Sequence, residues 1–226
     1  MNKSIPIVII AWNNLTFVKK FILQIQKFNH PIIVLDNNST YLPLLDYYKT
    51  LDENSIKVHK LNYNYGHFVY HHMSNLLPDI FILSDPDLEL NTKMPIDTID
   101  ILYKLSLEFK ASRVGVALDI SDHDKFIKGS YGEMVYNIES GYYKEIIPHE
   151  KFEIYKAPTD TTFCLINRNH PYGIQIRIGG NFIAKHLPWY ENYLKDNIPK
   201  DELKIWVINN KSSSILEHID ISKLLS

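Results

Sequence analysis

Apolar residues in the first half of the chain follow two alternating patterns. Continuous apolar runs are typical of strands that are buried on both faces. Together with one alternating run, they predict strands at residues 5–10, 31–36, 55–61, 80–84 and 113–118. Apolar residues at helical spacing predict helices over 17–28 and 96–110, and Pro43 suits the first turn of a third helix. This alternation predicts an α/β fold with a mostly parallel central sheet and helices on both faces.

The second half of the chain is less regular. Its patterns predict short strands at 154–158, 161–167 and 174–180, and helices or turns at 187–196 and 201–210. Residues 214–226 have the pattern of a short amphipathic helix. Because neither an internal repeat nor a low-complexity linker interrupts the sequence, we expect a single domain over residues 1–226.

Composition narrows the class of protein. The 226 residues are 45% hydrophobic, which is enough for a sizeable core, and the net charge of −2 offers no cationic field for nucleic acid. The single cysteine, Cys164, excludes an intramolecular disulfide and is expected to be buried. The N-terminus has the pattern of a first strand and not of a signal peptide, and no transmembrane segment is expected. We therefore expect a cytoplasmic protein.

Polar residues follow each of the first four predicted strands. They form clusters at Ala11–Asn14, Asp36–Ser39, Asn62–His67 and Asp85–Asp87. Any one cluster could be a loop with capping residues. Parallel strands, however, bring their carboxyl ends to one edge of the sheet, where ligands bind in open α/β folds. The four clusters together therefore predict a ligand site at that edge.

Asp85 and Asp87 indicate how a phosphorylated ligand could be held. The sequence contains neither a dinucleotide-binding Gly-rich motif nor a P-loop. Two carboxylates one residue apart can hold Mg²⁺ or Mn²⁺, which can bridge a diphosphate. The alternative is that both carboxylates only cap the turn after the strand. His67 and His71, four residues apart, could also share a metal, but no third ligand is obvious.

Six segments between Ile5 and Tyr190 resemble a known family. They read IPIVIIAWNN, IVLDNNSTYLPLLDYY, NYGHF, LSDPDLEL, YKAPTDTTFCL and GGNFIAKHLPWY. The chain resembles nucleotide-sugar glycosyltransferases of the GT-A fold, close to the small stand-alone enzymes of bacterial polysaccharide clusters and large DNA viruses. The resemblance implies a Rossmann-like fold with a nucleotide-sugar-binding half at 1–118 and an irregular acceptor-side half at 119–226. If the chain is viral, the location would be the host cytoplasm.

The resemblance also implies a binding site for a UDP-sugar donor. Backbone groups of Ala11, Trp12 and Asn13 would border the uracil. Asp36 would hydrogen-bond the uridine, with Asn38 near it. Two further residues, Asn64 and Gly66, would line the path to the diphosphate. Lys185 could reach the diphosphate, or it could be a solvated surface lysine.

For the chemistry, the resemblance implies a metal site made by Asp85, Asp87 and His186, with Mn²⁺ or Mg²⁺ bound. Asp160, in a polar turn before a predicted strand, would face the sugar. It could deprotonate the acceptor, which gives inversion, or orient it, which gives retention. The alternative for Asp160 is a simple Asx turn. A histidine metal ligand is more usual among retaining members, which favours retention.

The expected function is transfer of a hexose, with UDP-glucose as the first candidate donor. The acceptor would be a hydroxyl of a glycan or a glycosylated protein, for example a galactosylhydroxylysine of a collagen-like protein. Trp189 and Tyr190 could stack on the acceptor or pack in the core, and residues 120–126 could touch the acceptor. The alternatives are a non-catalytic sugar-nucleotide or glycan binder and a sugar nucleotidyltransferase; a homodimer is left open.

Overall fold

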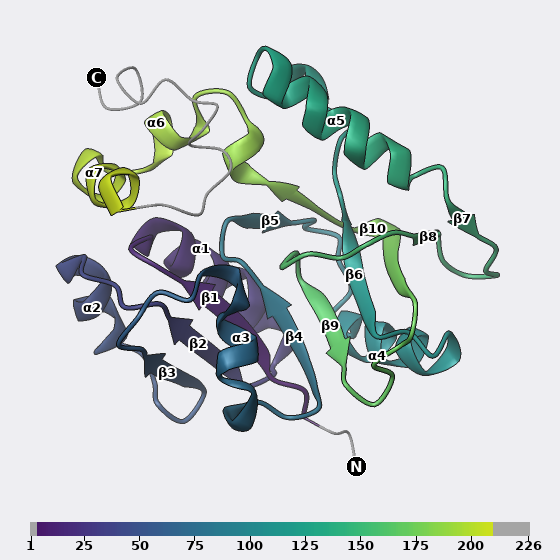
Figure 1. Cartoon of the computed structure of the whole chain (residues 1–226), viewed down its shortest axis with the longest axis horizontal. Coiled ribbons are helices and arrows are strands. Elements are labelled where there is room, and N and C mark those ends of the chain that lie inside the picture. The colour runs from purple at the N-terminus through teal and green to yellow at the C-terminus, as the bar shows by residue number, and fades with distance from the viewer. Residues whose placement is uncertain (1–3, 210–226) are drawn as a thin grey trace.

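The computed structural model describes residues 4–209 and contains one ten-stranded sheet (Figure 1). Along the sheet the strands follow the order β3-β2-β1-β4-β9-β6-β10-β8-β7, and β5 pairs with β10. Their bounds are β1 Ile7–Ala11, β2 Ile32–Asp36, β3 Ile56–Lys60, β4 Ile80–Ser84, β5 Leu88–Leu90, β6 Arg113–Leu118, β7 Ile146–Ile147, β8 Ile154–Lys156, β9 Cys164–Asn167 and β10 Gln175–His186.

The predicted α/β fold with a mostly parallel sheet is confirmed. Strands β3, β2, β1 and β4 are parallel neighbours, and pairings through β9 and β10 leave seven of the ten described strands in one direction. Strand β6 does not pair with β4, because β9 lies between them, antiparallel to both. Since β9 comes from residues after 118, both halves of the chain build the same sheet.

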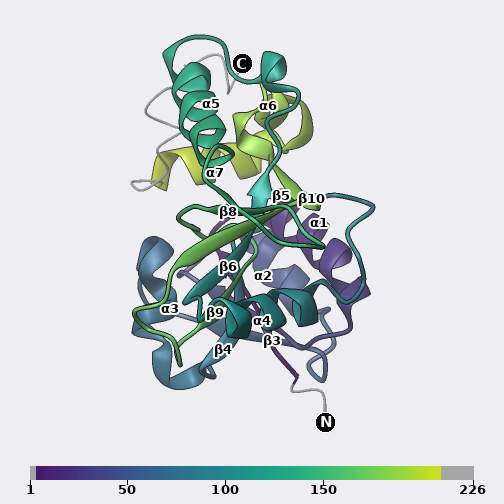
Figure 2. The ribbon, with the colours of Figure 1, turned by 90° about the vertical axis from the view of Figure 1, so that its right-hand side faces the viewer.

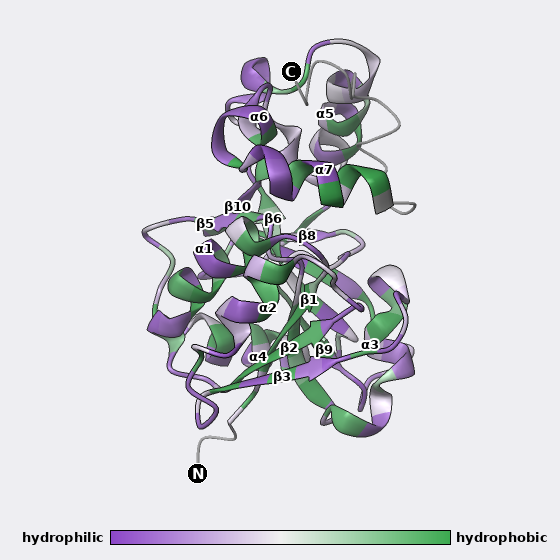
Figure 3. Ribbon diagram, turned by 90° about the vertical axis from the view of Figure 1, so that its left-hand side faces the viewer, coloured by the Kyte–Doolittle hydropathy of each residue, from purple (hydrophilic) through white to green (hydrophobic). Residues whose placement is uncertain are grey.

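Helices cover both faces of the sheet, as the sequence predicts. The side chains of Ile7 and Ile9 face a core shared with α1, α2 and α4. Those of Val8 and Ile10 face a second core shared with α3. The helices on the two faces are α1 Leu15–Ile25, α2 Leu42–Tyr48, α3 Val69–His72 and α4 Thr98–Glu108. Figure 3 shows the hydrophobic strands in the interior between these helices.

Three further helices gather beyond the carboxyl ends of β6 and β10 (Figures 2 and 3). They are α5 Ser130–Tyr142, α6 Tyr193–Asn197 and α7 Lys200–Asn209. The sequence pattern does not predict α5, which contains two glycines. Gly132 is required there, because a Cβ at this position would lie 2.1 Å from the carbonyl oxygen of Ile127. The predicted helix at 214–226 lies outside the described residues.

Helix α7 is fixed to the first half of the chain by two acidic residues. The buried carboxylate of Glu202 accepts hydrogen bonds from the backbone N–H of Thr16 at 2.9 Å and from its hydroxyl at 2.8 Å. It thereby satisfies a free N–H in the first turn of α1. Asp201 accepts a hydrogen bond from the Tyr41 hydroxyl at 2.8 Å. No helix among residues 4–209 has the length and apolar character needed to cross a membrane.

The Glu202 anchor makes stability depend on pH. Burial raises the pKa of this carboxyl above its ordinary value of 4.5, although the bonds from Thr16 lower it. The folded protein thus keeps a proton that the unfolded chain has lost, and the free energy of unfolding falls as pH rises through that window. We expect Glu202→Gln to show a smaller fall above pH 4.5 than the wild type, measured by urea unfolding at several pH values. Glu133→Gln, at an exposed position, should leave the dependence of unfolding free energy on pH as in the wild type. A wild-type pH dependence in Glu202→Gln would contradict the role assigned to Glu202.

Candidate functional site

Two adjoining cavities lie at the carboxyl ends of the first four strands. The larger has a volume of about 690 Å³ and the smaller about 550 Å³. Both sizes fall in the range of small-molecule sites. They share four lining residues: Trp12, Asn64, Gly66 and His67. All four predicted polar clusters contribute residues to the larger cavity, and three of them contribute to the smaller one, so the fold brings these clusters together at one edge of the sheet.

The loops after β1 and β2 form part of the smaller cavity. Asn13 and Asn38 line it, and both have positive φ angles, of 51° and 64°. Asparagine tolerates this region better than most residues. The Asn13 side-chain oxygen accepts hydrogen bonds from the backbone N–H groups of Thr40 and Tyr41, and the Asn13 N–H donates to the Ser39 hydroxyl. The two loops are therefore held together as one wall.

Asp36 and Ala11 lie beneath this wall. Both are almost fully buried, and neither lines the two cavities. One carboxylate oxygen of Asp36 accepts from the Ser39 N–H at 2.8 Å, and the other accepts from the Tyr48 hydroxyl at 2.9 Å. The structure thus places Asp36 as a support of the loop. The direct hydrogen bond to uridine expected for Asp36 stays a prediction.

The turn at Asn64 and Gly66 lies between the two cavities. Gly66 has a φ of 59° and begins a short 3₁₀ turn, and its N–H donates to the Asn64 side chain at 2.8 Å. Asn37, a member of the predicted polar cluster Asp36–Ser39 to which the sequence assigned no role of its own, secures this turn. It donates to the Gly66 carbonyl at 3.0 Å, accepts from the Tyr65 N–H at 3.2 Å and lines the larger cavity. Its position directly after Asp36, at the end of a predicted strand, was the sequence feature that could have indicated a role in the site.

Strand pairing brings Asp87 to His186. Strands β5 and β10 are antiparallel with Leu88 opposite His186, and the Leu187 N–H donates to the Asp87 carbonyl at 2.9 Å. The Asp87 carboxylate then lies 3.6 Å from His186 Nε2. One carboxylate oxygen of Asp87 and Nδ1 of His186 are buried and have no hydrogen-bond partner. Buried polar atoms without partners are costly, so this pair fits a bound cation.

Asp85 lies beside this pair and is held by Thr161. Its N–H donates to the Thr161 carbonyl at 2.7 Å, and its carboxylate accepts from the Thr161 hydroxyl. Burial, followed by the charge of Asp87, raises the pKa of Asp85. Within residues 4–209, no three or more His, Cys, Asp or Glu side chains form a group that could hold a metal ion. Of the predicted ligand set, Asp87 and His186 thus lie together as a pair, and Asp85 lies beside them with its carboxylate bound to Thr161.

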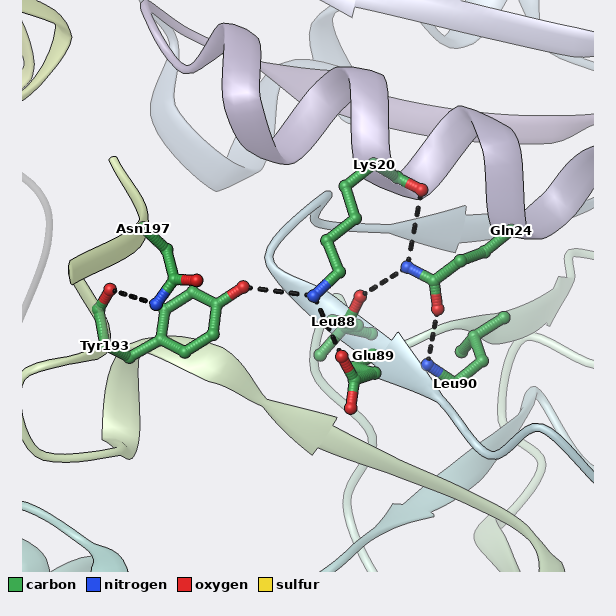
Figure 4. Close-up of polar contacts among 7 residues, drawn as sticks. All are labelled: Lys20, Gln24, Leu88, Glu89, Leu90, Tyr193 and Asn197. Carbon is green, nitrogen blue, oxygen red and sulfur yellow. Dashed lines mark hydrogen bonds and ion pairs between the residues drawn. The ribbon is translucent and has the colours of Figure 1, made fainter. Parts of the chain in front are cut away.

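Helix α1 holds β5, the strand that follows Asp87 (Figure 4). The Gln24 side chain donates to the Leu88 carbonyl at 3.1 Å and accepts from the Leu90 N–H at 2.8 Å. It thereby pairs with an edge of β5 as a neighbouring strand would. Lys20 binds Glu89 at 2.8 Å and the Tyr193 hydroxyl at 3.1 Å, which connects α1 to α6.

If Asp87 and His186, here called the metal pair, bind a cation, we expect Gln24→Ala to weaken that binding without altering either residue. The loss leaves the Leu90 N–H unpaired, at a cost of about 1–3 kcal/mol, and loosens the strand that positions Asp87. A group that hydrogen-bonds a metal ligand directly contributes about 10- to 100-fold to metal affinity, and because Gln24 acts only through the backbone of β5, we expect a loss of about tenfold or less. Titration with Mn²⁺ followed by electron paramagnetic resonance measures the change. Leu23→Ala, on the exposed side of the same helix, is the matched control; equal Mn²⁺ affinity in both variants would contradict this role.

Asp160 lines the larger cavity from a rigid loop. It is exposed, and its charge contributes to the raised pKa of Asp85, behind burial and Asp87, which places it near Asp85. Phe163 has a φ of 46°, which is strained for a bulky residue, and its buried ring packs against Phe21 and Phe28. This packing fixes the loop that carries Asp160.

Lys185 forms an ion pair outside the two cavities. Its Nζ binds Asp122 at 2.6 Å, and the Tyr190 hydroxyl binds the other oxygen of Asp122 at 2.7 Å. Neither cavity is lined by Lys185. In this structure the Lys185 ammonium is paired with Asp122, and its expected contact with a diphosphate stays a prediction. Asp122 belongs to the polar segment 120–126, which holds Lys185 and lines neither cavity.

Arg177 and Glu139 form a buried ion pair in the larger cavity, which the sequence analysis missed. Arg177 Nη1 lies 2.6 Å from a Glu139 oxygen, and Nε donates to the Pro158 carbonyl at 2.8 Å. Burial raises the pKa of Glu139, although Arg177 lowers it. The signal was an arginine inside the apolar strand IQIRIGG, since a buried charge requires a partner.

Histidines 67, 71 and 72 pack against aromatic rings. His67 lies 3.9 Å from the Phe68 ring, and His72 lies 4.3 Å from the Tyr65 ring, between centroids. No three-ligand metal group involves them among the described residues. Cys164 is buried as predicted, and burial raises its pKa to about 11, which disfavours the reactive thiolate.

No family model and no curated protein matches this sequence. Among solved structures, S. aureus TarS 1-349 is similar at 10% identity and a TM-score of 0.49, over 99% of this chain and 69% of that chain. S. aureus TarS 1-349 in complex with UDP-GlcNAc is similar at 15% identity and a TM-score of 0.39, over 52% of this chain. The match spans 35% of that second structure. A likeness this distant assigns neither activity nor substrate to the present chain.

Proposed function

We propose that the chain is a metal-dependent glycosyltransferase of the GT-A type. It moves a hexose from a UDP-sugar to a hydroxyl of a glycan or a glycosylated protein. The observation that carries the proposal is the convergence of Asp87, His186 and Asp160 on one cavity. That cavity adjoins a second one of a size suited to a nucleoside. A fold alone would not support this reading, but the site residues do.

The smaller cavity suits a uridine. Its wall is rich in aromatic rings and side-chain amides, which can stack on a base and hydrogen-bond its edge. The residues that supply them are Trp12, Asn13, Asn38, Tyr63, Asn64, Tyr65 and Phe68. The shared residues Asn64 and Gly66 then mark the passage of the diphosphate toward Asp85 and Asp87. The hexose would lie in the larger cavity, facing Asp160.

A divalent cation held by Asp87 and His186 would stabilise the charge that develops on the departing UDP. The acceptor oxygen forms a bond to the anomeric carbon while the bond from that carbon to the diphosphate oxygen breaks. Following the family resemblance, we propose glucose as the hexose and retention as the outcome. Asp160 then orients the acceptor, and the hydroxyl proton leaves on the departing diphosphate. If the reaction inverts, Asp160 takes that proton instead.

The test is release of nucleoside diphosphate from a panel of nucleotide sugars, with and without Mn²⁺. We expect release from a UDP-hexose only in the presence of the metal. No metal-dependent release from any donor would count against the enzyme. The anomeric configuration of the product, determined by NMR, decides between retention and inversion. With inversion, Asp160→Asn should abolish transfer; with retention, it should reduce transfer while leaving the configuration unchanged.

One observation favours a second candidate, a non-catalytic binder of sugar nucleotides. Among residues 4–209, the metal donors form a pair and not a group of three or more. A binder would take up UDP-sugar, measured by calorimetry, without releasing UDP over hours. An enzyme would bind the UDP-sugar and release UDP from it.

A further inference from the structure

One face of α5 forms a long wall of the larger cavity. Six residues line the cavity at spacings of three and four, which is the periodicity of one helix face. They are Tyr131, Met134, Val135, Ile138, Glu139 and Tyr142. Five of the six carry aromatic or aliphatic side chains. The cavity therefore extends along this face of α5.

Part of this wall is exposed although it is apolar. Met134 is 43% exposed and Ile138 is 48% exposed, and both face the cavity. Trp189 after β10 and Trp206 on α7 line the same cavity and pack against the cluster that contains Tyr131 and Val135. Indole rings beside an aliphatic helix face suit the apolar face of a sugar ring and a hydrocarbon group attached to it.

The charges in the cavity disfavour a ligand that carries a phosphate or carboxylate next to Asp160. Three aspartates, Asp85, Asp87 and Asp160, line the cavity together with Glu139. No lysine lines it in the described part of the chain, and its one arginine, Arg177, already pairs with Glu139 at 2.6 Å. In the proposed function the divalent cation compensates the donor diphosphate, so a phosphate or carboxylate of the acceptor next to Asp160 would be repelled without a further cation.

From these observations we infer that the acceptor is an uncharged glycoside with an apolar aglycone. Its sugar lies between Asp160 and the indole rings, and its aglycone lies along Met134 and Ile138 of α5. This inference rests on the proposed function, because it names the acceptor class for the same site. It excludes acceptors whose reacting sugar carries a phosphate group.

The test compares three probes that bind the full chain in the absence of donor. Hexyl β-galactoside has the apolar group, methyl β-galactoside lacks it, and galactose 6-phosphate carries the charge. Affinities are measured by saturation-transfer NMR. We expect the hexyl glycoside to bind at least about tenfold more tightly than the methyl glycoside, because burial of two methylenes is enough for that factor. Galactose 6-phosphate should bind more weakly than either.

Substitutions on α5 and β7 locate the site. Ile138→Lys places a cation on the exposed wall and should not disturb folding, because the position is half exposed. We expect it to remove the preference for the hexyl over the methyl glycoside and to strengthen binding of galactose 6-phosphate. Ile146→Lys, on a strand outside the cavity and 68% exposed, is the matched control and should behave as the wild type.

The outcomes separate this inference from the proposed function. Equal affinity for hexyl and methyl glycosides, or tighter binding of galactose 6-phosphate, overturns the inference even if the protein releases UDP from a UDP-hexose. An unchanged preference in Ile138→Lys also overturns it. A chain that prefers the hexyl glycoside but releases no nucleoside diphosphate from any donor overturns the transferase, and with it the acceptor role of the glycoside.

Discussion

Asp87→Asn is expected to lower metal-dependent release of UDP by about 100- to 1000-fold, the range seen when one group that stabilises transition-state charge is removed. An amide keeps the shape of the side chain but loses the charge that holds a cation next to His186, 3.6 Å away. The initial rate of UDP release at saturating UDP-hexose and Mn²⁺ measures the loss. Mn²⁺ affinity should fall in parallel, which separates loss of metal from loss of substrate binding.

Asp46→Asn is the matched control for this substitution. Asp46 is exposed and pairs only with Lys49 at 2.7 Å on the surface, so the rate should not change. His186→Ala should weaken Mn²⁺ binding in the same direction as Asp87→Asn, because Nε2 of His186 lies 3.6 Å from the Asp87 carboxylate. Full activity in both Asp87→Asn and His186→Ala would falsify the metal role of this pair.

Arg177→Met is expected to reduce the free energy of unfolding by about 3–5 kcal/mol, which is typical when one partner of a buried ion pair is removed. The substitution leaves the Glu139 carboxylate buried without its partner at 2.6 Å and removes the bond to the Pro158 carbonyl. It also removes the cation that lies 5.0 Å from the centre of the Tyr142 ring. Urea unfolding followed by tryptophan fluorescence measures the loss.

Two comparisons identify the cause of that loss. The double variant Arg177→Met with Glu139→Leu should recover much of the stability, because no uncompensated charge remains in the interior. Lys49→Met breaks an exposed ion pair and should cost less than about 1 kcal/mol. A loss as small in Arg177→Met as in Lys49→Met would show that the buried pair does not support the junction of α5 and β10.

The sequence predicted the elements whose burial pattern is local. Continuous apolar runs marked β1, β2, β4 and β6, because strands buried on both faces need apolar residues at every position. Helical spacing marked α1 and α4 in the same way. Helix α5 was missed because Gly132, Gly141 and a weak apolar stripe hide its period, and only packing against residue 127 explains the first glycine.

For the site, the sequence placed polar clusters at the correct strand ends, but it could not say which atoms remain available. Asp36 and Lys185 had the right chemistry for a donor site, yet each is paired inside the protein, with Tyr48 and Asp122 respectively. Arg177 lay inside a predicted strand, and its partner, Glu139, is 38 positions away in the chain.

The sequence by itself determined the α/β class, the buried strands and the position of Asp85 and Asp87 at a strand end, because these depend on periodicities of two and 3.6 residues within short segments. Only the tertiary structure decided that Asp87 meets His186, which requires the antiparallel register of β5 and β10. It also decided that α5 and Trp206 close the larger cavity. The physical reason is that contacts between distant segments depend on strand order and packing, which no local pattern of residues specifies.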